Sequence, residues 1–147
     1  MLTALIDYES GNLHSALKAF EKISSENSLG SVTITNDPEI ISNADRLVLP
    51  GDGAFPACKA ALEKSEVFEA LKHAVLAKRR PFLGICVGMQ LMARKGFEFE
   101  QTNGLNWING QVERIQLDDP SLKIPHMGWN EICLLYTSDA ADDLRGG

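Results

Sequence analysis

Short apolar segments alternate with longer amphipathic ones along most of this 147-residue chain. Residues 2–6, 32–34 and 46–49 have the length and the apolar character of buried strands. Between residues 13 and 23, apolar side chains recur at intervals of three and four, which places them on one face of a helix. We therefore expect a helix whose apolar stripe packs against a sheet.

Two further helices are predicted from the same kind of pattern. Asp37 and Pro38 supply an N-cap and a first helical residue for a short helix that ends near Asn43. A helical region after residue 53 places apolar side chains on one face, at Phe68, Leu71 and Val75. The alternation predicts an α/β domain, with a mostly parallel, flavodoxin-like sheet flanked by helices and a ligand crevice at the carboxyl ends of its strands.

Residues 81–90 follow that helical region and are apolar without alternation over Phe82, Leu83 and Ile85. This run predicts a strand that is covered on both faces. Residues 90–94 then have the character of a helix. Cys86 is accordingly expected at a turn from strand to helix.

Two glycines, Gly84 and Gly88, flank Cys86 at a distance of two residues on either side. Such spacing is typical of a nucleophile elbow, where the backbone is strained and neighbouring side chains would collide. The first N–H groups of the following helix would favour the thiolate, and Val87 N–H would face a developing oxyanion. The alternative is a core thiol, because free cysteine is often buried only for packing.

The turn Pro50-Gly51-Asp52-Gly53 comes at the carboxyl end of another predicted strand. It lacks the lysine and the hydroxyl residue of a phosphate-binding loop. Two glycines one residue apart would let backbone N–H groups approach an oxyanion, so the segment is either a plain turn or a second donor loop beside Val87.

Composition narrows the function classes. The formal net charge is −6, from 20 acidic and 14 basic residues, and the one basic cluster is at residues 78–80. Nucleic acid and membrane surfaces are therefore not expected partners. The N-terminus has no basic leader and no apolar run approaches the roughly 20 residues of a membrane span, so we expect a cytoplasmic protein. Three widely spaced cysteines form no metal pattern, and neither metal nor cofactor is predicted.

Four segments resemble one protein family, in that family's order. The G-I-C-V-G-M-Q segment at residues 84–90 resembles the nucleophile motif of class I glutamine amidotransferases. Residues 7–12 (D-Y-E-S-G-N), 49–55 (L-P-G-D-G-A-F) and 125–130 (P-H-M-G-W-N) narrow the resemblance to the glutamine amidotransferase subunit of imidazole glycerol phosphate synthase, in histidine biosynthesis. The last of them is the most specific, because it is long and unusual in composition.

The resemblance implies a role for each matching residue. Cys86 would be the nucleophile that attacks the side-chain amide of glutamine, with Val87 and the loop Gly51, Asp52 and Gly53 as oxyanion donors. Gln90 and Glu98 would hold the substrate, although a glutamate in such a loop is often only a solvated charge. Asp52 departs from the family, because a small apolar residue is expected there and a carboxylate would repel an oxyanion unless it points away.

The resemblance also implies a partner, a (β/α)8 barrel cyclase that uses the ammonia. The positions expected to face it are Asn12, Pro125, His126, Met127, Gly128, Trp129 and Asn130. The family's base is a later histidine that is followed two residues on by glutamate. His14 and His73 are predicted to be surface or packing residues, and no histidine of this chain has that glutamate.

The resemblance covers residues 1–132, which we interpret as the N-terminal portion of a glutamine amidotransferase domain. Residues 133–147 are interpreted as a non-family tail that is disordered or artefactual. The prediction is a glutaminase subunit that forms a cysteine thioester and passes ammonia to the cyclase, represented here by an inactive fragment. The alternatives are the glutaminase of another class I amidotransferase, or a non-catalytic fragment that only docks on the cyclase.

Overall fold

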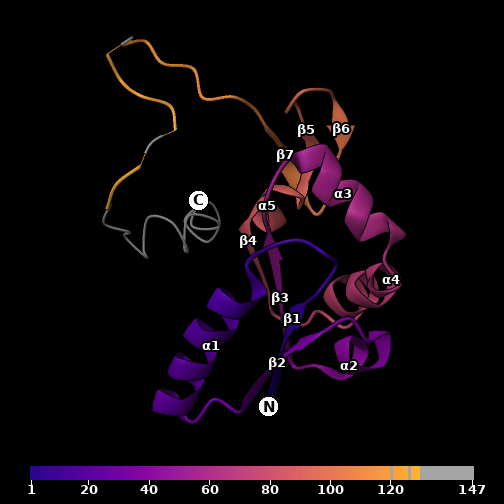
Figure 1. Cartoon of the computed structure of the whole chain (residues 1–147). Coiled ribbons are helices and arrows are strands. Elements are labelled where there is room, and N and C mark those ends of the chain that lie inside the picture. The colour runs from indigo at the N-terminus through magenta and orange to yellow at the C-terminus, as the bar shows by residue number, and fades with distance from the viewer. Residues whose placement is uncertain (120, 126, 130–147) are drawn as a thin grey trace, which may run out of the picture. The chain divides into compact units, whose positions relative to one another are not determined.

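A four-stranded parallel sheet lies at the centre of the first of two units of the chain, residues 1–114. The computed structural model describes residues 1–119, 121–125 and 127–129. The strands are β1 (Leu2–Ile6), β2 (Ser31–Thr35), β3 (Arg46–Gly51) and β4 (Phe82–Cys86), in the order β2-β1-β3-β4 (Figure 1). The predicted α/β fold with a mostly parallel sheet flanked by helices is confirmed.

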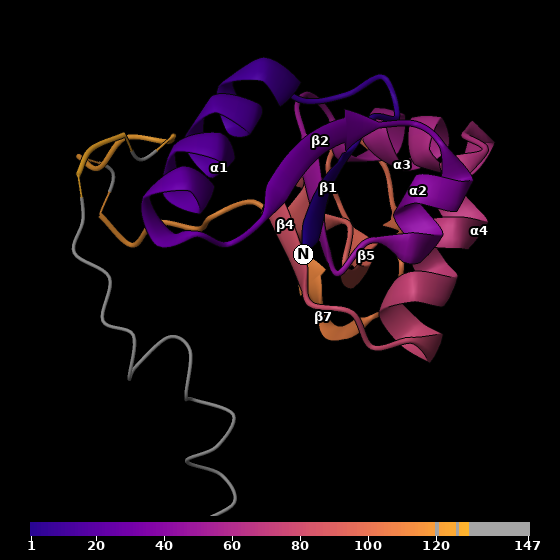
Figure 2. The same cartoon turned by 90° about the horizontal axis from the view of Figure 1, so that it is seen from below.

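Helices cover the two faces of this sheet unequally. They are α1 (Leu13–Asn27), α2 (Pro38–Asn43), α3 (Phe55–Lys64) and α4 (Val67–Lys72), and α4 continues into the π-turn η1 (His73–Ala77). Figure 2 shows α1 on one side of the sheet and α2, α3 and α4 on the other. Side chains cap two of the helices. Asp37 Oδ1 accepts from Glu39 N–H, as predicted, and Asn12 Oδ1 accepts from Ser15 N–H.

The main core lies between the sheet and the helices α2, α3 and α4. Its fully buried members come from both layers and include Ala4, Ile6, Ile41, Leu47, Leu49, Leu62 and Leu71. On the α1 side, the predicted apolar stripe is only partly covered, and Ile23 is 53% exposed. An apolar groove of about 280 Å³ runs there between α1 and the strands.

The prediction that the Cys86 strand is covered on both faces is wrong for the part of the chain that the structure describes. Leu83, in the middle of β4, is 51% exposed. The reason is that α1, the helix on this side of the sheet, packs mainly against β2 and β1, whereas β4 lies at the opposite edge and pairs with β3 alone. An apolar run fits a strand buried on both faces, but the run itself does not specify what covers each face.

The predicted helix over residues 90–94 is also wrong. The helix after Cys86 is the single turn α5 (Val87–Gln90), and it is followed by strand β5 (Ala93–Gly96). Instead of continuing the helix, the carbonyl groups of residues 91–93 accept hydrogen bonds from the N–H groups of residues 105–107. Strand β5 then pairs with β6 (Thr102–Asn103) and β7 (Ile108–Val112) in a second, three-stranded sheet.

The second unit begins at Ile115. Its described residues form turns and bends, and all but one of them are exposed. The predicted boundary at residue 132 and the predicted tail, residues 133–147, lie outside the described part of the chain. Among the described residues, no helix is long and apolar enough to cross a membrane.

Candidate active site

Cys86 lies at a sharp turn between a strand and a helix. Strand β4 ends at this residue and α5 begins at Val87, so the turn occupies a single peptide link. The backbone of Cys86 has φ 55° and ψ −119°, a conformation that L residues other than glycine rarely adopt. Its thiol is exposed. The strained backbone therefore presents the sulfur outward, as the predicted elbow requires.

The two flanking glycines are needed for this turn. A Cβ at Gly84 would lie 2.5 Å from the Cα of Met89, inside the turn itself. A Cβ at Gly88 would overlap the carbonyl oxygen of Leu49 on the neighbouring strand. Any side chain at either position would force the backbone apart, which explains the G-x-C-x-G spacing.

The loop that was predicted to supply oxyanion donors lies next to the nucleophile. Strands β3 and β4 pair in parallel, and their register places Gly51 opposite Cys86. A Cβ at Gly51 would overlap the Gly88 nitrogen and would lie 3.0 Å from the Val87 carbonyl carbon. The carboxyl ends of the two strands thus bring together Cys86, Val87 and Gly51, which are far apart in the sequence.

Asp52 carries the carboxylate that was expected to repel an oxyanion unless it points away. The residue is exposed, and the structure describes no hydrogen bond or ion pair of its side chain. Its backbone is held instead. Asp52 N–H donates to Ser10 Oγ at 3.1 Å, and Ser10 Oγ–H donates to the Asp52 carbonyl at 3.0 Å. The Cys58 thiol donates to the same carbonyl at 3.3 Å and lies 3.2 Å from Ser10 Oγ.

The sequence motifs assigned no role to Ser10 or Cys58. Ser10 belongs to the turn after β1, and Gly11 lets this turn approach the loop: it has φ 96°, and a Cβ there would lie 2.8 Å from Pro50 Cβ. The signal that was available is a polar turn at the carboxyl end of a strand, where parallel sheets place their functional loops. Cys58 is buried in α3, directly behind the loop.

Tyr8 fills the space beneath this arrangement. Its side chain is 2% exposed, and its hydroxyl lies 2.9 Å from where a Gly51 Cβ would be. The hydroxyl has no hydrogen-bond partner of good geometry among the described residues. Burial raises the pKa of Tyr8 to about 12, against a smaller lowering by Ser10, while negative charge on Cys58 and Cys86 would raise it further. The phenol is therefore a neutral donor at any physiological pH.

The two predicted substrate-binding residues have different surroundings. Glu98 Oε2 accepts a hydrogen bond of 2.7 Å from Phe55 N–H, at the start of α3. Its carboxylate therefore caps the helix that directly follows the loop, a favourable place for negative charge. Gln90 is partly buried at the end of α5, rather than in the first turn of a longer helix. Contact of either residue with substrate stays a prediction.

The predicted partner-facing residues belong to both units. Asn12 is exposed and caps α1. Pro125, Met127, Gly128 and Trp129 are exposed in the second unit, whereas His126 and Asn130 lie outside the described residues. His14 and His73 are exposed on α1 and η1, as predicted for surface residues. The interface role stays a prediction.

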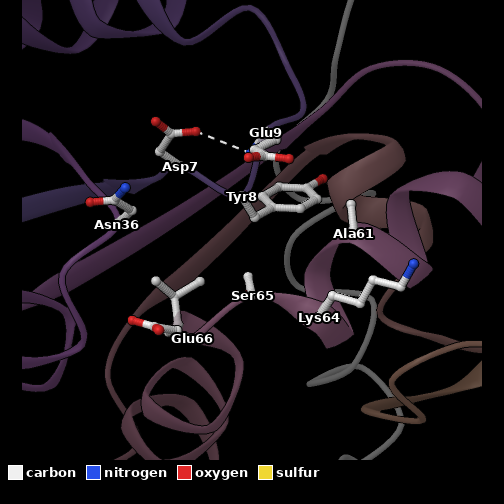
Figure 3. Close-up of a pocket in the computed structure, with 9 residues that line it drawn as sticks. Asp7, Tyr8, Glu9, Asn36, Ala61, Lys64, Ser65 and Glu66 are labelled. Atoms are coloured by element: carbon white, nitrogen blue, oxygen red, sulfur yellow. Dashed lines mark hydrogen bonds between the residues drawn. The ribbon is translucent and has the colours of Figure 1, made fainter.

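A cavity of about 310 Å³ lies at the carboxyl ends of β1 and β2, and Tyr8 is among its lining residues, whereas Cys86 is not. Figure 3 shows its mixed lining, with Asp7, Glu9 and Glu66 around it and Lys64 on one side, and the bond of 3.1 Å from Glu9 N–H to Asp7 Oδ1. None of the predicted site residues lines this cavity. Within the described ranges, no group of three or more histidine, cysteine or acidic side chains could hold a metal ion.

Comparison with known proteins decides the family. Residues 4–144 match the family described as glutamine amidotransferase class-I. The chain belongs to this family. The class I amidotransferase assignment agrees with the elbow at Cys86 and with the Gly51 loop beside it, and it supports an enzyme of the glutaminase kind.

Similar proteins narrow the assignment within the class I amidotransferases. The chain is 54% identical over 148 residues to the imidazole glycerol phosphate synthase subunit HisH of Ruegeria pomeroyi, covering 100% of the chain and 70% of that relative. It is 56% identical over 133 residues to HisH of Cereibacter sphaeroides (90% and 63%), and 51% over 133 residues to HisH of Caulobacter vibrioides (90% and 62%). The chain thus spans between 62% and 70% of these relatives, and the predicted resemblance is confirmed.

Proposed function

We propose that this chain is the nucleophile-bearing part of a glutaminase subunit of imidazole glycerol phosphate synthase. The observation that carries the proposal is the register between two parallel strands, which places Gly51 opposite Cys86 at the end of a strained elbow. A nucleophile and a glycine loop in this relation are suited to acyl transfer through a tetrahedral intermediate.

In the proposed reaction, the Cys86 thiolate attacks the side-chain carbonyl carbon of glutamine and forms a C–S bond. The carbonyl oxygen becomes an oxyanion, which Val87 N–H and an N–H of the loop stabilise. Collapse of this intermediate breaks the C–N bond, and the departing amine leaves as ammonia after it gains a proton. Water then attacks the γ-glutamyl thioester, which releases glutamate and restores the thiol.

We further propose that ammonia is the useful product and that it passes to a (β/α)8 barrel cyclase. The partner-facing surface would include Asn12 and the exposed residues around Trp129. Gln90 would offer a donor and an acceptor to the substrate, and Glu98 would face its α-ammonium group. The bond from Phe55 N–H to Glu98 uses one carboxylate oxygen and leaves the other for this contact.

One group that the resemblance implies, the histidine that serves as base, is missing from these 147 residues. The three histidines are at positions 14, 73 and 126, and none is followed two residues on by glutamate. A missing general acid–base typically costs about 10²- to 10⁴-fold in rate. We therefore expect no turnover of glutamine by these residues, although the nucleophile, the elbow and the loop are in place.

An activated ester tests the proposed chemistry without requiring that base. The γ-glutamyl p-nitrophenyl ester has a leaving group that departs without protonation, so its acylation of Cys86 needs only the thiolate and the oxyanion donors. We expect one equivalent of p-nitrophenolate and a γ-glutamyl adduct on Cys86 by mass spectrometry.

Two controls accompany this measurement. Cys86→Ala should release p-nitrophenolate no faster than buffer, while Cys133→Ala should behave like the parent chain. With glutamine and the cyclase partner, the chain and Cys86→Ala should release glutamate at the same background rate. An adduct on Cys58 or Cys133 in place of Cys86 contradicts the proposed function, and Cys86-dependent glutamate release contradicts the proposed inactivity of these residues.

A further inference from the structure

The cavity of about 310 Å³ at the carboxyl ends of β1 and β2 is lined by none of the residues assigned to the glutaminase reaction. Its walls come from three parts of the sequence: the turn after β1, the residue after β2 and the connection between α3 and α4. The carboxyl ends of parallel strands are where open α/β sheets bind ligands. A cavity of this volume is at the lower end of the range for small-molecule sites, so it fits a small ligand.

The charged groups of this cavity are unequal in number and lie on different sides. Asp7, Glu9 and Glu66 contribute three carboxylates, whereas Lys64 contributes the one ammonium group among the lining residues. Figure 3 shows Asp7 and Glu66 on the side opposite Lys64. No ion pair joins any two of these four side chains within the described structure. The cavity therefore offers both signs of charge, apart from one another, with an excess of negative charge.

The walls between the charged groups are held in place and partly apolar. Asp7 Oδ1 accepts from Glu9 N–H at 3.1 Å, and its other carboxylate oxygen has no hydrogen bond among the described residues. Ser65 Oγ–H donates to the Leu62 carbonyl at 2.6 Å, which fixes the connection between α3 and α4. Tyr8 and Val67, both buried, add apolar surface to the lining. The site thus has charged ends and an apolar middle.

We infer that this cavity is a binding site for a basic amino acid, a ligand with two cationic groups, one carboxylate and a short apolar stem. The α-ammonium group and the side-chain cation would each face a carboxylate of the lining, and the α-carboxylate would face Lys64. The stem would pack on Tyr8 and Val67. A neutral amino acid would leave the excess negative charge unmatched, and an acidic one would be repelled. This site is separate from the proposed function and does not depend on it.

The experiment is an NMR titration of the full 147-residue chain, labelled with ¹⁵N, with four probes. L-lysine carries every group that the site requires. L-norleucine has the same stem without the side-chain cation, 1,5-diaminopentane lacks the carboxylate, and L-glutamate reverses the side-chain charge. We expect L-lysine to shift the amide signals of Glu9, Asn36 and Ser65 and to bind most tightly. Losing one ion pair at a partly exposed site should weaken binding about twofold to fivefold for norleucine and for diaminopentane.

Two variants assign the ends of the ligand. Lys64→Gln should weaken L-lysine about twofold to fivefold without weakening 1,5-diaminopentane, because only the former has a carboxylate for this side chain. Glu66→Gln should weaken both probes by a similar factor. Glu26→Gln is the matched control: it removes the same charge from an exposed position on α1 that does not line the cavity, so binding should not change.

Several results would overturn the inference. Equal binding of L-lysine and L-norleucine, or amide shifts that are not centred on the cavity, would exclude a site for a basic amino acid. If 1,5-diaminopentane binds more tightly than L-lysine, or if Lys64→Gln affects the two alike, the ligand's carboxylate has no place there. An equal loss in Glu26→Gln and Glu66→Gln would indicate attraction to the overall negative charge alone. Cys86→Ala should bind L-lysine like the parent chain, so failure of the proposed glutaminase function would leave this result unchanged.

Discussion

At the elbow, backbone atoms of neighbouring segments come so close to Gly84 and Gly88 that neither position has room for a Cβ, whereas nothing lies within 4 Å of the Cβ position of Gly128. The same contrast holds for the large side chains. Val87 is buried beside the nucleophile, while Trp129 and Met127 are almost entirely exposed. Both segments carry distinctive motifs, so a distinctive motif does not imply a packed structure.

The two motifs differ in what fixes their conformation. The elbow is determined by packing within residues 1–114, so its geometry is a property of that unit alone. The segment around Trp129 has no comparable support from the described residues of its own unit. An exposed tryptophan of this kind is typical of an anchor that is buried only in a complex.

The largest effect is expected from Gly88→Ala. The new Cβ would overlap the carbonyl oxygen of Leu49, whose backbone is held by its pairing with Gly84 in the ladder of β3 and β4. We expect a loss of about 3 kcal/mol or more in the free energy of unfolding, at the upper end of overpacking effects. Urea denaturation measures it.

Gly110→Ala is the matched control for this change. Nothing lies within 4 Å of the Cβ position of Gly110, so stability should change by less than about 1 kcal/mol. If the two variants lose the same stability, close backbone packing does not determine the elbow. The lack of room for a Cβ at Gly88 would then have no effect on the free energy of unfolding.

The buried phenol beneath the loop gives the next largest effect, at alkaline pH. Burial raises the pKa of Tyr8 to about 12, from 10.0 in the unfolded chain, so the folded state keeps a proton that the unfolded state loses. This contribution to stability is fully present below pH 10 and is lost as the pH rises through about 12. Its size is roughly 2 to 3 kcal/mol.

Tyr8→Phe isolates the titration of this group. The variant should lose less stability than the parent chain between pH 10 and 12, and at pH 7 it should be about as stable, because the removed hydroxyl has no partner of good geometry. Denaturation at several pH values provides the comparison. Parallel losses in the two proteins would show that Tyr8 titrates normally and that the space beneath the loop is open to water.

In the second unit, Trp129→Ala should leave the free energy of unfolding nearly unchanged. The side chain is fully exposed, so its removal should alter the free energy of unfolding by less than about 0.5 kcal/mol. Affinity for the cyclase should fall by about 2 kcal/mol, as expected for an interface anchor. Calorimetric titration with the cyclase measures this loss.

Trp107→Ala provides the aromatic control. Trp107 packs edge-to-face on Phe82 with ring centroids 5.2 Å apart, so its truncation should cost about 2 kcal/mol or more of stability. The two tryptophans should therefore give opposite results in the two assays. A large loss of stability in Trp129→Ala, without a change in affinity, would place that side chain in a core.

The sequence predicted those parts of the fold and the site that depend on neighbouring residues. The strand ends, the helix start at Asp37 and the turn at Cys86 follow from spacing, capping and glycine placement. The short length of α5 could not be predicted in this way, because the N–H groups of residues 105–107 bind the carbonyls of residues 91–93, which directly follow the helix. Likewise, the exposed face of β4 depends on which strands α1 covers.

The candidate site was predicted less completely than the fold, for the same reason. Ser10 meets Asp52 across 42 residues, and Glu98 meets Phe55 across 43. No local sequence pattern encodes such contacts. They are nevertheless what fixes the backbone of the glycine-rich loop and of the helix that follows it. The carboxyl-end rule for parallel sheets indicates where such partners gather, but not which atoms bind.

Cys86 can be tested as the nucleophile by reaction of the chain with a diazoketone analogue of glutamine, followed by peptide mapping of the three cysteines. We expect labelling of Cys86 first, because its thiol is exposed at the elbow, and we expect protection by added glutamine. Cys58 is buried and should react only after unfolding. Labelling chiefly on Cys58 or Cys133, or labelling of Cys86 that glutamine does not slow, would contradict the assignment of Cys86 as the glutaminase nucleophile.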